Sequence, residues 1–339
     1  MRFGIFLFAS VEDAAGRAAR AEREGFDSVW FPEFLTRRPD GREHAEPLVA
    51  MSYAAARTRR IGFGTAVLGA LRRHPAVLAQ EAATLARLSG RRVVLGMGVG
   101  ARRQDVALGI WRHVDADYLS EYVGLLRAFW AGGPVTFSGR HFSVAGATPA
   151  VAPPSGIQAL IGGYSEDSKR AAAAAGDGWL ANWLYSPGTF GRLLSEVREF
   201  AGRAGRDQSG IMGGYLTGVA IAGDAERQLE FARELAFGVM PAIQLQDYGA
   251  KLLEAEGFRG DADSPSRIPE GFVRRTFLLG GPDEAIGRLE EYARAGVDEM
   301  LLHFMDERSE REFARRVIPH FREAAGLPRG IAPRGLRGR

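Results

Sequence analysis

Residues 60–100 hold two apolar segments with a helical segment between them, and they read RIGFGTAVLGALRRHPAVLAQEAATLARLSGRRVVLGMGVG. Ile61–Val67 and Arg92–Met97 are short apolar runs of the kind that form buried strands. Pro75 stands where a proline opens a helix, and apolar residues at helical spacing continue to Leu88. A strand, a helix and a second strand in this order predict two parallel strands joined by a crossover helix.

The same alternation continues on both sides of this stretch. Six further strands are predicted at residues 2–8, 28–31, 157–161, 179–181, 215–222 and 300–304. Further helices are predicted at residues 11–24, 47–57, 115–130, 166–175, 187–203, 224–238, 283–295 and 307–325. Eight strand–helix units favour an α/β fold, a closed (β/α)8 TIM barrel, with an open doubly wound sheet as the alternative. We expect the strands to end near Phe8, Phe31, Val67, Met97, Gly162, Ala181, Ala222 and Phe304.

Two segments depart from the regular alternation. Residues 135–144 alternate in polarity around a Ser-Gly pair, which predicts a surface β-hairpin. The seventh and eighth strands lie much further apart than one crossover helix requires, so residues 240–277 are expected to form an insertion between them. We expect residues 1–326 to form one domain and residues 327–339, rich in Arg, Gly and Pro, to form a flexible tail.

Composition excludes several classes of function. The net charge of +3 depends on four tail arginines, because without them 40 basic residues face 41 acidic ones, so we expect no nucleic-acid partner. The chain has no cysteine, and its six histidines lack metal-ligand spacing, so no metal site is expected. It shows no signal peptide and no apolar stretch long enough to span a membrane. A cytoplasmic protein with no membrane partner is the expectation.

The predicted strand ends carry few groups for acid–base chemistry. Glu33 follows the second strand, and Arg72, Arg73 and His74 follow the third. Asn182, Trp183 and Tyr185 follow the sixth strand, and His303 lies in the eighth. No pair of acids, no Ser/His/Asp set and no lysine stands at a strand end. A barrel with so few reactive side chains indicates that a bound cofactor carries the chemistry.

Two glycine-rich segments follow strands. Residues 96–100 read GMGVG, but Arg103 stands where a dinucleotide fingerprint needs its last glycine, so they indicate either a tight strand exit or backbone close to a flat ligand. Residues 161–169 read IGGYSEDSK and lead into a predicted helix. The free amides and the dipole of that helix suit an anion such as a phosphate. The alternative is that Ser165 only caps the helix.

The sequence resembles the luciferase-like flavin-dependent oxidoreductase superfamily. The segments that carry the resemblance are residues 21–33, 60–67, 73–75, 82–91, 95–100, 161–165 and 176–179, with a weaker match at 279–284 and 295–298. The resemblance implies an eight-stranded barrel that binds FMN or the deazaflavin coenzyme F-420 at the carboxyl ends of its strands. It also implies a small-molecule substrate and a homodimer.

The resemblance assigns cofactor contacts residue by residue. Ala66 and Val67 match the bulge after the third strand, where the family often has a cis peptide bond under the flavin ring. The other matching positions are Gly98, Gly100 and Gln104 beside the cofactor and Gly162, Gly163, Tyr164 and Ser165 at its phosphate.

The family contains two chemistries. Deazaflavin members transfer a hydride to or from a substrate, whereas FMN members activate oxygen with reduced flavin from a separate reductase. The 339-residue length and the Gly-Asp-Gly-Trp segment at 176–179 are more similar to the deazaflavin, methylene-tetrahydromethanopterin-reductase-like branch. We therefore expect hydride transfer with coenzyme F-420. An FMN-dependent monooxygenase and a flavin-binding protein without catalysis are the alternatives.

Two positions depart from the family pattern. Phe34 follows Glu33 where luciferases and sugar-phosphate dehydrogenases have a histidine, and Ala101 stands where the dehydrogenases have an acid. Oxidation of a sugar phosphate is therefore not expected.

Glu33 and His74 are the candidate catalytic residues, as proton relays. The alternative for Glu33 is an ion pair with Arg72 or Arg73, and the alternative for His74 is a structural role at the start of a helix.

Overall fold

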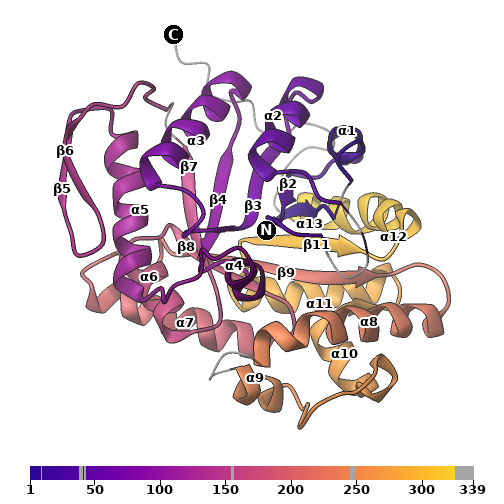
Figure 1. Cartoon of the computed structure of the whole chain (residues 1–339). Coiled ribbons are helices and arrows are strands. Elements are labelled where there is room, and N and C mark those ends of the chain that lie inside the picture. Colours follow the sequence, from indigo (N-terminus) through magenta and orange to yellow (C-terminus); the bar gives the residue numbers. More distant parts are fainter. Residues whose placement is uncertain (9, 38–40, 42, 154–155, 245–248, 325–339) are drawn as a thin grey trace.

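Eight parallel strands close on themselves in the computed structural model, which describes residues 1–8, 10–37, 41, 43–153, 156–244 and 249–324. Their order around the barrel is β9-β11-β1-β2-β3-β4-β7-β8, and β8 pairs again with β9 (Figure 1). The strands are β1 (Arg2–Phe6), β2 (Ser28–Phe31), β3 (Gly62–Gly69), β4 (Val93–Gly98), β7 (Ile157–Gly162), β8 (Gly178–Asn182), β9 (Met212–Ala220) and β11 (Glu299–Phe304). The predicted TIM barrel is confirmed and the open sheet is excluded.

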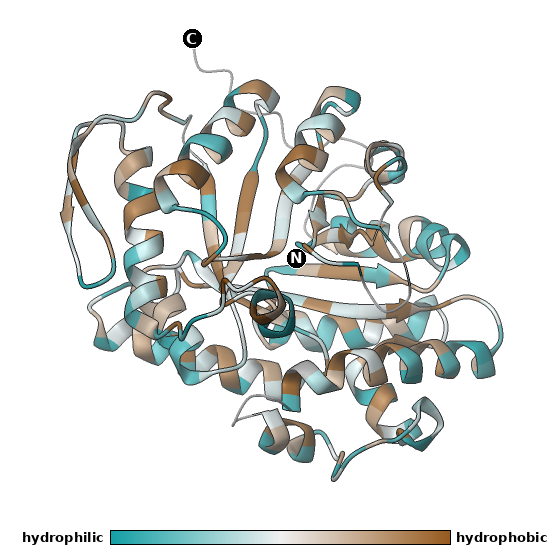
Figure 2. Cartoon of the chain, viewed as in Figure 1, coloured by the Kyte–Doolittle hydropathy of each residue, from teal (hydrophilic) through white to brown (hydrophobic). Residues whose placement is uncertain are grey.

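Helices surround the barrel and bury one face each. They are α1 (Ala14–Glu24), α2 (Pro47–Arg57), α3 (Pro75–Ser89), α5 (Ala116–Trp130), α6 (Glu166–Ala174), α7 (Pro187–Arg203), α8 (Ala225–Gln244), α11 (Pro282–Arg294), α12 (Glu307–Glu312) and α13 (Ile318–Ala324), the last two joined by a π-helical turn, Phe313–Val317. Apolar and polar bands alternate along them in Figure 2. A proline opens α2, α3, α7 and α11, because its fixed φ suits the first helical position and its missing amide costs nothing there.

Trp30 fills the barrel interior between two glycines. A Cβ atom on Gly4 would lie 2.5 Å from the Trp30 indole nitrogen, and one on Gly64 would lie 2.3 Å from Trp30 Cε3. Glycine on the neighbouring strands β1 and β3 therefore makes room for the largest side chain. Trp30 is fully buried, and its indole N–H donates to Ser28 Oγ at 2.8 Å.

Most element boundaries agree with the sequence within two residues. β1 ends at Phe6 rather than Phe8, and β9 ends at Ala220 rather than Ala222, whereas β3 continues to Gly69 beyond an irregular register between Thr65 and Leu68. The predicted hairpin is confirmed as β5 (Val135–Ser138) paired antiparallel with β6 (Ser143–Ala147). The sequence did not predict the short helix α4 (Arg102–Ala107) or the two-residue strand β10 (Leu278–Leu279), which pairs with β9.

The segment between β9 and β11 is longer than its crossover requires, as predicted. Helix α8 continues to Gln244, beyond the expected end at residue 238, and is followed by α9 (Gly249–Ala255), a 3-10 turn (Pro265–Arg267) and α10 (Glu270–Thr276). Figure 1 shows α9 and α10 on the side of α8 that faces away from the barrel. Leu252 and Phe272 belong to the same cluster of buried side chains as the barrel core. The predicted tail, residues 327–339, lies outside the described residues.

Among the described residues, no helix is long and apolar enough to cross a membrane.

Candidate functional site

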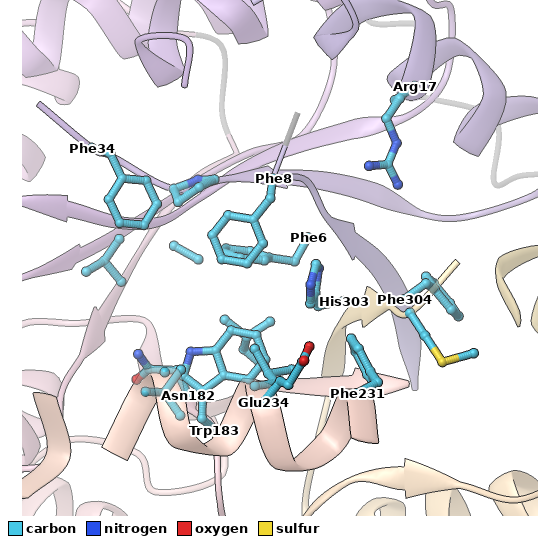
Figure 3. A pocket seen from close by; sticks show the side chains of 18 of the residues that line it. Phe6, Phe8, Arg17, Phe34, Asn182, Trp183, Phe231, Glu234, His303 and Phe304 are labelled. Carbon is cyan, nitrogen blue, oxygen red and sulfur yellow. The ribbon is translucent and has the colours of Figure 1, made fainter. Parts of the chain in front are cut away.

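A cavity of about 1440 Å³ lies at the carboxyl ends of the strands. The ends of β3, β4, β7, β8 and β11 line it together with α1 and α8, and Figure 3 shows side chains from several of these elements pointing into it. Pockets for drug-sized ligands usually measure about 300–1,000 Å³. This cavity is therefore large enough for a cofactor and a substrate together.

Small residues from three adjacent strands form one side of the cavity, which we call the glycine wall: Ala66, Val67, Gly98, Gly100, Gly162 and Gly163. The peptide bond between Ala66 and Val67 is cis, as predicted. A Cβ atom on Gly98 would lie 3.0 Å from Val67 Cγ2, and one on Gly162 would lie 2.9 Å from Val67 Cγ1. A side chain at either position would displace the Val67 methyl groups, so glycine lets Val67 lie close to β4 and β7.

The segment after β7 leads directly into α6. Gly163 has a φ of 142°, which favours glycine, and its carbonyl accepts from the Trp179 indole at 3.0 Å. Ser165 Oγ accepts from the Ser168 amide at 3.2 Å and lies 3.0 Å from Ser168 Oγ. Ser165 therefore caps α6, and it does not line the cavity. Binding of a phosphate by the amides at this helix end stays a prediction.

Tyr164 lines the cavity but uses its hydroxyl group internally. The hydroxyl donates to the Asn182 carbonyl at 2.5 Å, which ties the end of β7 to the end of β8. Burial raises the pKa of Tyr164, so the phenol stays neutral at every physiological pH. Tyr164 therefore supplies ring surface and backbone to the cavity rather than a free hydroxyl.

Aromatic rings form the opposite side, which we call the aromatic wall: Phe6, Phe8, Phe34, Trp183, Phe231 and His303. They come from the ends of β1, β2, β8 and β11 and from α8. Trp183 and the next residue, Leu184, have φ values of 58° and 61°, which are uncommon for residues with a side chain. Such conformations concentrate at functional sites, because the surroundings must hold them in place.

Glu33 lies behind the cavity rather than in it. Its Oε2 atom accepts from the Gly69 amide at 2.8 Å and from Arg72 Nη1 at 2.9 Å, and its Oε1 atom pairs with Arg73. Arg72 also binds Asp105 Oδ1 at 2.8 Å. The Glu33 side chain is buried, and it does not line the cavity. These contacts favour the ion-paired alternative, in which Glu33 positions the ends of β2 and β3.

Two further predicted site residues lie outside the cavity lining. His74 caps α3, because its Nδ1 atom accepts from the Ala76 amide at 3.2 Å. Gln104 Oε1 accepts from the Leu35 amide at 2.8 Å and holds the loop that follows β2. Both contacts are structural, so a direct contact of either side chain with a cofactor or substrate stays a prediction.

Charged residues surround the outer part of the cavity. Arg17, Arg20 and Arg23 line it from α1. Arg17 Nη2 lies 3.2 Å from Glu310 Oε2, and Arg20 pairs with both Glu307 and Glu310. Burial disfavours the charged form of Arg20, but its hydrogen bond to Glu307 and the two carboxylates raise its pKa above the ordinary value. Within the described residues, no group of three or more His, Asp or Glu side chains could hold a metal ion.

Sequence reasoning missed several residues that line the cavity. Phe231, Glu234 and Leu235 lie on α8, whose predicted role was to cover the outside of the barrel. His303 was visible as a histidine near the end of the eighth strand, a position that faces the active-site end of a TIM barrel. Nothing in the spacing of α8 indicates which of its faces lies over the cavity.

The model of the family described as luciferase-like monooxygenase matches residues 1–299. An F-420-dependent glucose-6-phosphate dehydrogenase of Amycolatopsis mediterranei (strain U-32) is 29% identical over 325 residues, which are 91% of this chain and 94% of that protein. The enzyme of the same name from Nocardia farcinica (strain IFM 10152) is 30% identical over 299 residues, 84% of this chain and 86% of that protein.

A solved structure shares the fold. The coenzyme F-420-dependent tetrahydromethanopterin reductase from Methanopyrus kandleri superposes with a TM-score of 0.80 at 23% identity, covering 94% of this chain and 99% of that one. With the family model covering most of the chain, these comparisons show that the chain belongs to the luciferase-like monooxygenase family.

Proposed function

We propose that the protein is an oxidoreductase that transfers a hydride between coenzyme F-420 and a small organic substrate. The observation that carries the proposal is the pairing of the glycine wall with the aromatic wall across one cavity of about 1440 Å³. The family membership supports it, as do the relatives whose names state dependence on F-420.

The residues present fit a flat cofactor with a phosphate group. The glycine wall offers backbone and small side chains, so a planar ring system can approach it closely. The amides at the start of α6 and the helix dipole suit the phosphate, although Glu166 and Asp167 add negative charge to that first turn. When bound, the deazaflavin supplies the hydride donor or acceptor.

The chain's own residues would then bind and orient the cofactor ring and shield the reacting atoms from water. Val67, seated on Gly98 and Gly162, presents a fixed apolar surface to a ring. The aromatic wall excludes water from the reacting atoms. Glu33 and His74 stay candidates for proton relay, but their observed partners support a positioning role for Glu33 and a capping role for His74.

The relatives named as glucose-6-phosphate dehydrogenases do not fix the substrate of this chain. Phe34 follows Glu33 and Ala101 follows Gly100, so the two departures from the dehydrogenase pattern stand at the mouth of the barrel. Phe34 and Ala101 both line the cavity. We therefore propose a substrate other than a sugar phosphate.

The remaining proposals rest on the resemblance. We propose that residues 1–326 act as one catalytic domain with residues 240–277 as its insertion, that the protein is a homodimer, and that it works in the cytoplasm. A separate flavin reductase would be a partner only in the FMN-dependent alternative.

Titration of the purified protein with coenzyme F-420 and with FMN tests the cofactor. We expect the deazaflavin fluorescence to report saturable binding of F-420 that is tighter than that of FMN. Tight binding of FMN without binding of F-420 would instead support the two-component monooxygenase. Saturable binding of either cofactor without turnover of any alcohol, carbonyl compound or oxygen would support the non-catalytic alternative.

A further inference from the structure

The aromatic wall points to a substrate class. Resting on the proposed function, we infer that this wall binds an uncharged, apolar alcohol or carbonyl compound and that His303 exchanges the proton on its oxygen atom. Three features carry the inference: the orientation of the His303 ring, the charges around it, and the chemistry that hydride transfer leaves to the protein.

Aromatic neighbours fix the orientation of the His303 ring. Its centroid lies 4.8 Å from that of Phe8 at an angle of 90°, and it makes similar edge contacts with Phe6 at 6.3 Å and Trp183 at 6.2 Å. Phe231 of α8 lies at 6.0 Å. Figure 3 shows the ring pointing into the cavity between Phe6 and Phe231. A ring held from several sides can present one edge to a ligand without reorganising.

The charges near the aromatic wall do not suit a phosphate. From α8, Arg227, Glu230 and Glu234 line the cavity, so this helix face carries one positive and two negative groups. Three arginines of α1 also line the cavity, and two of them, Arg17 and Arg20, are bound to Glu307 and Glu310. Asp13 of the β1–α1 loop and Asp306 after β11 add further negative charge.

A cavity lining without net positive charge favours an uncharged ligand. The four lining arginines (Arg17, Arg20, Arg23 and Arg227) face five lining carboxylates (Asp13, Glu230, Glu234, Asp306 and Glu307), a formal balance of 4 − 5 = −1. Moving a phosphate dianion from water into such a site is costly because no net positive charge compensates its desolvation. An apolar substrate instead gains free energy from the ring surface that it removes from water.

Hydride transfer leaves one proton for the protein to handle. When an alcohol is oxidised, its carbon loses a hydride with the bonding electron pair to the oxidised deazaflavin, its hydroxyl loses a proton to the His303 imidazole, and the carbonyl double bond forms. Reduction of a carbonyl compound runs the same exchange backwards. Imidazole suits both directions because the same ring can accept a proton and return it. Among the described lining residues, His303 supplies the one imidazole.

Direct binding of two probes tests the substrate class apart from activity. With F-420 bound, cyclohexanone should quench tryptophan fluorescence saturably and shift the His303 imidazole signals in the NMR spectrum, and glucose 6-phosphate should do neither. Phe231→Ala should weaken cyclohexanone binding about tenfold with F-420 affinity unchanged. Phe237→Ala is the matched control, because Phe237 lies on the same helix but does not line the cavity. Tighter binding of glucose 6-phosphate than of cyclohexanone would overturn the inference.

His303→Asn tests the proton exchange. We expect kcat for cyclohexanol oxidation or cyclohexanone reduction to fall by about 10²–10⁴-fold, with the loss of one limb of its pH profile. Binding of cyclohexanone and F-420 should change by less than about threefold. His320→Asn is the control, because His320 is exposed and pairs with Glu290. Full turnover in His303→Asn across pH would overturn the role of His303.

Failure of this inference and failure of the proposed function are distinguishable. If the wild-type protein does not bind F-420, the proposed function fails. If it binds F-420 but neither quenching nor NMR shifts appear with cyclohexanone, only the substrate inference fails.

Discussion

The two ends of the barrel use charge in opposite ways. At the amino ends of the strands, Glu299 is completely buried and every contact is internal: Ser28 Oγ lies 2.6 Å from Oε1, and Arg92 and Arg2 lie 2.7 and 3.2 Å from Oε2. At the carboxyl ends, the glycine and aromatic walls leave a cavity of about 1440 Å³ between them.

The difference shows how one fold separates stability from binding. At the amino ends of the strands, which we call the closed end, a hydrogen-bonded chain from Trp30 through Ser28 to Glu299 ties β2 to β11 across the one strand between them, β1. At the carboxyl ends of the strands, which we call the open end, Glu33 forms ion pairs with Arg72 and Arg73 outside the cavity lining. The two walls themselves are therefore almost free of ion pairs. We therefore expect changes at the closed end to act on folding and changes at the walls to act on ligands.

Glu299→Ala should have the largest effect on stability. Removing one partner of a buried, bonded ion pair costs about 3–5 kcal/mol, because the remaining charges lose their partner without leaving the barrel. Denaturant unfolding measures the free energy, and F-420 affinity of the folded variant should be unchanged. Glu291→Ala is the control, since its pair with Arg288 is exposed. A loss below about 1 kcal/mol would contradict the closed-end assignment.

The pH dependence of unfolding is a second test of the contribution of Glu299 to stability. Burial would raise the pKa of Glu299, but Arg92, Ser28 and Arg2 outweigh it and lower that pKa. Its stabilisation is present above the unfolded pKa of about 4.3 and is lost as pH falls through the lower folded value. Burial raises the pKa of Asp27, which accepts from the Phe3 amide, so its contribution is lost as pH rises. The unfolding free energy of both variants should be measured at several pH values. We expect its slope against pH to become less positive in Glu299→Gln and less negative in Asp27→Asn.

Glu33→Gln tests whether Glu33 takes part in catalysis or only positions the strand ends. We expect a loss of about 1.5–3 kcal/mol in stability, because a carboxylate that accepts from Arg72 and Gly69 becomes neutral. Turnover should keep the shape of its pH profile, and His74→Asn should have a smaller effect. A fall in turnover of about 10²–10⁴-fold with the loss of one pH limb would identify Glu33 as the proton relay after all.

Gly162→Ala should weaken the cofactor site by about 1–3 kcal/mol. The new Cβ would meet Val67 Cγ1 at 2.9 Å and the Leu180 carbonyl at 3.3 Å, so Val67 must shift out of the glycine wall. Fluorescence titration with F-420 measures the change. Gly188→Ala is the matched control, because a Cβ there meets nothing within 4 Å. Equal affinities in the two variants would place the cofactor elsewhere.

Ser165→Ala should give the smallest effect. Loss of the cap of α6 costs about 1 kcal/mol in stability, and F-420 binding weakens by up to about 1 kcal/mol if the Ser165 hydroxyl also contacts the phosphate. Asp115→Ala removes the cap of α5 together with its contacts to Arg140 and His141, so it sets an upper limit on the loss from capping away from the cavity. If both variants lose only stability, Ser165 is a cap without a phosphate contact.

Local sequence determined the elements of this protein. Runs such as residues 93–97 are apolar enough to be buried on both faces, and prolines at 47, 75 and 187 open helices through their own backbone geometry. The repetition of strand and helix then restricts the fold to a parallel sheet, and eight repeats favour closure. The glycines of the glycine wall were also indicated by the sequence, because they follow predicted strands, whereas Ala66 and Val67 were assigned through the family resemblance.

Only the tertiary structure decided the partners across the barrel. Glu33 and Arg73 are 40 residues apart, and Glu299 and Ser28 are 271 apart, so their pairing depends on strand register rather than on spacing. The same holds for α8, where the fold determines that Phe231 and Glu234 face the cavity. The spacing of apolar residues along a helix or strand indicates which side chains are buried, because residues on one face of an element are buried together. It does not encode what they meet, because that is set by elements brought together from the whole chain.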